Sequence, residues 1–76
     1  MSTLYIGKGK KDKISKGDIV GFLCKKGGLE PSEIGKIDVK EHYAYCAIRR
    51  ERMQEVIQNV RGEKIKGVKT IIESVK

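Results

Sequence analysis

The strongest constraint on the fold of this chain is the alternation of side chains over residues 41–48. Side chains of a β-strand point to opposite faces in turn, so Tyr43, Tyr45 and Ala47 share one face. The other face carries small apolar residues suited to packing beneath helices: Ala44, Cys46 and Ile48. If the tyrosine face is open, nucleic-acid bases can stack on it, at roughly 1–3 kcal/mol per base. An ordinary sheet strand with amphipathic tyrosines gives the same pattern, so the rest of the chain must decide.

Length and charge narrow the class of protein. A chain of 76 residues forms one small domain, which buries only about 60% of its unfolded surface and has little room for a deep catalytic pocket. The chain carries 17 Lys and Arg against 10 Asp and Glu, a net charge of +7. This surplus favours a polyanionic partner. Nucleic acid is the first candidate, and an anionic membrane surface is the competing one.

The apolar and cysteine patterns bear on the compartment and on metal binding. No apolar run approaches the ~20 residues that span a bilayer, and no secretion leader is recognisable. Cys24 and Cys46 fall within apolar patterns, so we interpret both as reduced, buried thiols of a cytoplasmic protein. Together with His42 they match no zinc spacing, and no metal site is expected.

The first half of the chain predicts a strand, a loop and a helix. Residues 4–6 alternate aliphatic and aromatic side chains and place Tyr5 on the same face as the other tyrosines. Residues 7–13 have no periodicity and predict a flexible basic loop, whose glycines let backbone amides approach a ligand closely. Ser15 is a good N-cap, and Asp18 completes a capping box. An apolar stripe at helical spacing follows: Ile19, Val20, Leu23 and Cys24.

The second half completes a recognisable order of elements. A single helical turn over residues 29–35 precedes a strand over residues 36–40, whose Lys36 and Lys40 point outward. That strand pairs with the tyrosine strand through a tight turn. An apolar stripe predicts a second helix over residues 50–61, and residues 68–75 supply the last strand. The βαββαβ order predicts an α+β, ferredoxin-like sandwich, with two helices on one face of a four-stranded antiparallel sheet.

RNA-recognition motifs have this architecture and stack bases on the open face of the sheet. Residues 4–6 match the first-strand signature of the motif, and residues 43–45 match the centre of the third-strand signature. Three positions of the third-strand signature differ. Glu41 replaces a basic residue, His42 replaces glycine, and Ile48 replaces the last aromatic residue.

A resemblance covers nearly the whole chain. Residues 9–14 and 17–21 resemble the opening of the C-terminal RNA-binding domain of DbpA-like DEAD-box RNA helicases. Residues 34–37 resemble that family's entry into the second strand, and residues 65–67 resemble its ending. The blocks occur in the family's order at suitable spacing. Val68 and Ile71 depart from the basic residues that relatives often carry there.

The resemblance implies that residues 1–76 are one monomeric RNA-binding domain, excised from the C-terminus of a longer helicase. The domain itself is then not an enzyme and needs no cofactor, whereas the parent helicase uses ATP and Mg²⁺. The implied partners are the helicase core in cis and structured RNA, in particular ribosomal RNA during large-subunit assembly. Neither a Gly-Lys-Ser/Thr phosphate loop nor an Asp-Glu-Ala-Asp motif is present in this sequence.

The candidate RNA-binding residues fall into two groups. The tyrosines form a stacking platform, and basic side chains contact phosphate: Lys8, Lys10, Lys11, Lys13, Lys36 and Lys40. We expect the loop lysines to dominate, assisted by the positive end of the helix that begins at Ser15. The alternatives are a protein-interaction or small ribosome-associated module with the same fold and, ranked last, a basic domain for membrane surfaces.

Overall fold

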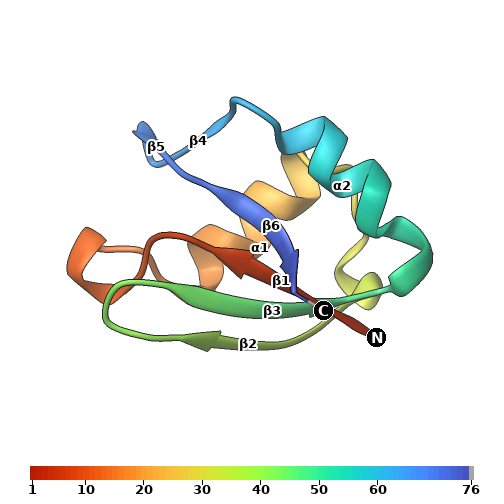
Figure 1. Cartoon of the computed structure of the whole chain (residues 1–76), viewed down its shortest axis with the longest axis horizontal. Helices are drawn as coiled ribbons and strands as arrows, with labels where there is room; N and C mark the ends of the chain where they lie inside the picture. Colours follow the sequence, from red (N-terminus) through yellow and green to blue (C-terminus); the bar gives the residue numbers. More distant parts are fainter. Residues whose placement is uncertain (76) are drawn as a thin grey trace.

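The computed structural model describes residues 1–75 and has two layers, a sheet and a pair of helices (Figure 1). The sheet is antiparallel with the strand order β2-β3-β1-β6, and both helices lie on one of its faces. The elements of this βαββαβ frame are β1 (Ser2–Ile6), α1 (Lys16–Lys25), β2 (Ile34–Val39), β3 (Ala44–Ile48), α2 (Met53–Val60) and β6 (Ile72–Val75). The arrangement confirms the predicted ferredoxin-like fold.

Shorter elements join these strands and helices. The 3₁₀ turns are η1 (Lys10–Asp12), η2 (Pro31–Glu33) and η3 (Arg50–Arg52), and a separate hairpin consists of β4 (Lys64–Ile65) and β5 (Val68–Lys69). The predicted second helix therefore begins as a 3₁₀ turn before α2. Within residues 1–75, neither helix is long and apolar enough to cross a bilayer.

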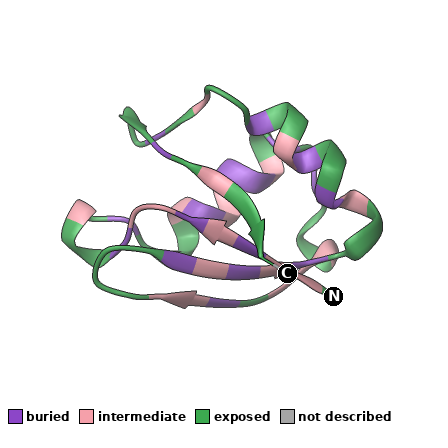
Figure 2. Ribbon diagram, viewed as in Figure 1, coloured by how far each residue is buried: buried purple, intermediate pink, exposed green. Residues whose placement is uncertain are grey.

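The core lies between the helices and the inner face of the sheet. Alternate residues of β3 are buried, which appears as alternating purple and pink along that strand in Figure 2. The apolar stripe of α1 is shifted from the predicted one, because Ile19, Phe22 and Leu23 are its buried residues. Phe22 was missed by the sequence pattern, and Cys24 is only half-buried. The stripe of α2 is as predicted, with three buried members and one partly buried: Met53, Val56, Val60 and Ile57.

Helix α1 begins as the sequence predicts. The Ser15 hydroxyl accepts a hydrogen bond from the Asp18 amide at 3.3 Å, and the Asp18 carboxylate accepts one from the Ser15 amide at 2.9 Å. This reciprocal pair satisfies two backbone donors that a helix start leaves free. The helix is followed by Gly28, whose φ of +75° suits glycine.

The last strand is shorter than predicted. Lys66 and Gly67 both have positive φ, 51° and 77°, and they turn the chain into the β4–β5 hairpin. Val68 and Lys69 therefore pair with β4, and β6 begins only at Ile72. The side chain of Ile65, 2% exposed, holds the hairpin against the core.

The basic loop is also ordered, contrary to the prediction of a flexible segment. The Lys10 and Lys11 amides donate to the carbonyl oxygens of Lys40 and Glu41 at 2.8 and 2.9 Å. These two acceptors lie in the tight turn between β2 and β3, so the loop is docked on that turn. Gly9 permits the contact, because a Cβ at this position would overlap the Lys40 carbonyl oxygen. The glycine serves this internal contact rather than the predicted approach of a ligand.

Substitution of two glycines tests this packing. Gly9→Ala should lower the free energy of unfolding by roughly 1–3 kcal/mol, because backbone atoms on the turn must move. Gly21→Ala, in the middle of α1, should raise it by about 0.5–1 kcal/mol, because its added Cβ meets nothing within 4 Å. Urea denaturation of both variants measures the difference. Equal stabilities would show that the loop is not docked as described.

Candidate nucleic-acid interface

Three tyrosines gather on the sheet face opposite the helices. Tyr5 and Tyr45 are directly opposed in the β1–β3 pair, and Tyr43 immediately precedes β3. The ring centroids of Tyr43 and Tyr45 lie 5.3 Å apart in an edge-to-face arrangement, whereas Tyr5 lies 6.1 Å from each of the other two. None of the rings packs beneath the helices, so their predicted placement on the open face is confirmed. Their role in RNA binding stays a prediction.

The tyrosines differ in how much surface they offer. Tyr43 is 37% exposed, whereas Tyr5 and Tyr45 are half-buried, because they contact each other and their strand neighbours. Aromatic contacts of this kind contribute about 0.5–1.5 kcal/mol beyond the buried area. The cluster is therefore preorganised. Tyr43 presents the most accessible ring for a stacked base.

Acidic side chains flank the tyrosines across the sheet. Asp38 of β2 is opposite Tyr45, and Glu73 of β6 is opposite Tyr5. The Lys40 ammonium lies 3.1 Å from the Asp38 carboxylate, and this hydrogen bond and charge raise the pKa of Lys40. Lys40 therefore already has an anionic partner. Asp38, Tyr45, Tyr5 and Glu73 thus form a row across the open face. This tyrosine row is suited to uncharged bases more than to phosphates.

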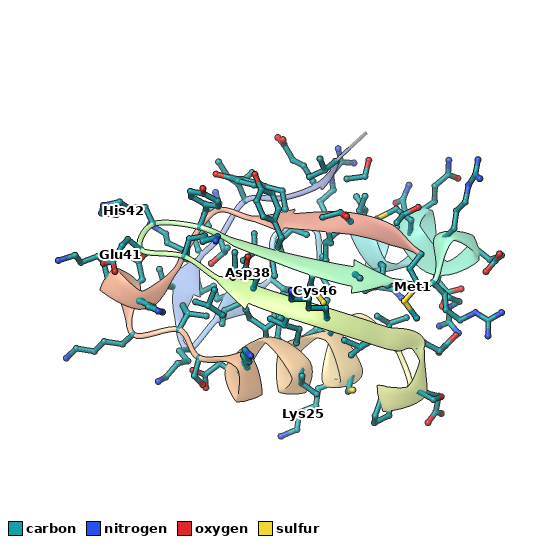
Figure 3. The ribbon with its side chains drawn as sticks, turned by 90° about the horizontal axis from the view of Figure 1, so that it is seen from below. Met1, Lys25, Asp38, Glu41, His42 and Cys46 are labelled. Carbon is teal, nitrogen blue, oxygen red and sulfur yellow. The ribbon has the colours of Figure 1, made fainter. Side chains whose placement is uncertain are left out.

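The loop lysines are only partly free. Lys8 lies 3.9 Å from Asp12, and Lys11 lies 4.0 Å from Glu41. Exposed ion pairs of this kind contribute little, so an incoming phosphate can replace the carboxylate at small cost. For Lys10 and Lys13, no acidic partner within 4.0 Å is present among residues 1–75. The turn that supports the loop carries Glu41 and His42 at its tip (Figure 3).

A hollow of about 460 Å³ brings two predicted lysines together. Lys10 and Lys36 line it between the start of α1 and the edge strand β2, with Ile14 and Ile37 among its walls. Lys16 lines the same hollow and was missed by sequence reasoning. The sequence could have indicated Lys16, because a cation in the first turn of a helix is unfavourable next to the helix dipole and therefore suggests another role. No ion pair engages these three lysines within the described residues.

The start of α1 already carries a carboxylate, and whether it assists phosphate binding stays a prediction. The Asp18 carboxylate already occupies it, and hydrogen bonds from Ser15 hold the pKa of this carboxyl below its usual value. Lys66 lies 3.5 Å from the same carboxylate and also lowers its pKa. The Asp18 carboxylate therefore competes with any phosphate for the positive end of this helix.

Cys46 is not an activated nucleophile. Cys24 and Cys46 are both free thiols, and burial raises the pKa of Cys46 to about 11, so this thiol stays protonated near neutral pH. In the part of the chain that the structure describes, no three His, Cys, Asp or Glu side chains are grouped to hold a metal ion.

Comparison with known proteins bears on this interface. The model of the DbpA RNA-binding domain family matches residues 3–74. The ATP-dependent RNA helicase DbpA of Escherichia coli K12 is 40% identical over 67 residues, which are 88% of this chain and 15% of that protein. A solved structure described as showing cis-element recognition of non-polyadenylated RNAs by the Nab3 RRM superposes with a TM-score of 0.78 at 22% identity. It covers 99% of this chain and 95% of the Nab3 chain, and at this identity the likeness shows the fold alone.

Amide hydrogen exchange tests whether the basic loop is ordered. The Lys10 and Lys11 amides should exchange slowly, because both donate to carbonyl oxygens of the β2–β3 turn. In Gly9→Ala their protection should fall while the amides of α1 keep theirs. Exchange in the parent chain as fast as in an unstructured peptide would contradict the docked loop. Exchange resolved for each amide by NMR gives the measurement.

Proposed function

Because this chain belongs to the DbpA RNA-binding domain family, we propose that it tethers an ATP-dependent RNA helicase to structured RNA. The chain spans 15% of the length of its curated relative, and the proposed parent carries the helicase core in the same polypeptide. ATP and Mg²⁺ then belong to that parent, and this domain contributes binding without catalysis. We further propose that the domain is monomeric, that the parent is cytoplasmic, and that the RNA is ribosomal RNA during large-subunit assembly.

The observation that carries this proposal is the contact between the basic loop and the tyrosine platform. Gly9 packs against the backbone of Lys40 and Tyr43, which places the lysine-rich loop beside the residue that carries the most exposed ring. The tyrosine rings offer stacking surfaces to bases that are not paired. The lysines beside the rings would bind the phosphates of the neighbouring nucleotides. Rings and lysines together suit a folded RNA with an exposed loop.

Paired charge and ring variants test the two halves of this surface. Lys10→Gln with Lys36→Gln removes two cations from the hollow and should flatten the salt dependence of binding by roughly 0.9 per lost phosphate contact. Tyr43→Leu should weaken binding by roughly 1–3 kcal/mol at every salt concentration and leave the salt slope unchanged. Fluorescence anisotropy with a hairpin-containing fragment of large-subunit ribosomal RNA measures both.

A charge-matched control is available at the other end of the molecule. Arg49→Gln with Arg50→Gln also removes two positive charges. Arg49 precedes η3 and Arg50 begins it, and this segment joins β3 to α2 at the end of the molecule opposite the loop (Figure 1). This variant should bind like the parent. If the affinity of the parent chain for the RNA fragment does not change with salt concentration, the RNA proposal is contradicted and a protein-interaction module is favoured. If the lysine pair binds like the parent while Tyr43→Leu loses binding, the open sheet alone is the site.

A further inference from the structure

A second basic groove lies on the helical side of the molecule. It has a volume of about 280 Å³, lies between α1 and the β4–β5 hairpin, and is lined by Lys25, Lys26, Lys64 and Lys66. Lys25 points away from the sheet, as Figure 3 shows. Neither the tyrosine platform nor the hollow beside β2 shares any of these lysines.

The charges of this groove are incompletely balanced. Lys26 pairs with Glu63 at 3.7 Å, and Lys66 pairs with Asp18 at 3.5 Å. For Lys25 and Lys64, no acidic partner within 4.0 Å is present among residues 1–75. Lys25 is in the last turn of α1, where a cation complements the helix dipole, but this explanation does not apply to Lys64.

Lys64 also faces a second cation within its own hairpin. It is the register partner of Lys69 in the β4–β5 pair. Like charges directly opposite one another destabilise a strand pair. A hairpin with two residues in each strand therefore carries an electrostatic penalty that a bound anion would relieve.

Two glycines interrupt the side chains along the α1 wall of the groove, which also includes Asp18 and Phe22. Gly17 and Gly21 of α1 line it, and a Cβ at Gly21 would meet nothing within 4 Å. Core packing thus does not require glycine here, and each glycine within a helix costs about 0.5–1 kcal/mol relative to alanine. The two glycine positions leave room for the backbone of another molecule to approach α1 closely.

We propose that this groove binds the sugar–phosphate backbone of RNA, as a second contact separate from the tyrosine platform. The proposal rests on the RNA-binding function proposed above. Lysine ammonium groups bind phosphate as point charges and carry no sequence information, so the groove adds affinity and orientation. It is continuous with the basic loop, because the Lys66 ammonium donates to the Lys13 carbonyl oxygen at 3.1 Å. One folded RNA can therefore contact the loop and the groove together.

Removal of charge tests the groove in the 76-residue chain. Lys25→Gln with Lys64→Gln should flatten the salt slope for the hairpin-containing ribosomal RNA fragment by roughly 1–2 units. The Arg49→Gln, Arg50→Gln variant loses the same charge and should keep the parent slope. If the arginine variant flattens the slope equally, the effect is one of general charge and the groove proposal fails.

A steric variant separates shape from charge. Gly21→Gln fills the groove, keeps every lysine and places a good helix former in open space. It should weaken RNA binding at least several-fold while melting at or above the parent temperature. Suppose that the parent binds RNA and that both the Lys25→Gln, Lys64→Gln variant and Gly21→Gln bind it equally well. The groove is then not a contact, but the proposed function stands. If the parent binds no RNA, both proposals fall.

Discussion

The contact between the β1–α1 loop and the β2–β3 turn determines how the whole interface is arranged. The Lys10 and Lys11 amides reach the carbonyl oxygens of Lys40 and Glu41 only because Gly9 has no side chain in the way. The contact holds a lysine-rich segment against the turn that ends at Tyr43. The loop lysines and the tyrosines, which are separate in the sequence, are thereby brought side by side.

The sequence predicts those features that depend on local periodicity. The β3 alternation and the stripe of α2 repeat within a few residues, and the capping box joins Ser15 to Asp18 three positions on. All three are present. The docked loop depends instead on partners about thirty positions apart, which leave no periodic signal. The β4–β5 hairpin was missed for a different reason, because its turn has Lys66 at positive φ, where asparagine or glycine is usual.

The candidate site was predictable to a similar extent. Strand alternation places Tyr5 and Tyr45 on one face, because each tyrosine alternates with the core-facing residues of its own strand. Which lysines are free depends on side-chain pairing, and the sequence does not show that Lys40 is paired with Asp38. The hollow is formed by elements far apart in the chain. Lys16 was therefore recognisable only as a cation in an unfavourable position at the start of α1.

The distribution of charge separates two kinds of contact. On the open face, the tyrosine row lies between Asp38 and Glu73, so a phosphate centred there would meet carboxylates on both sides. The lysines that line the hollow and the groove without acidic partners among residues 1–75 lie beside α1 and at the edge of β2, away from that row: Lys10, Lys16, Lys25, Lys36 and Lys64. A polyanion attracted by the net charge of +7 would therefore keep its backbone along the end and the helical side. In the proposed complex only uncharged bases would then reach the rings, so the sheet would read unpaired nucleotides and the lysines would read RNA shape.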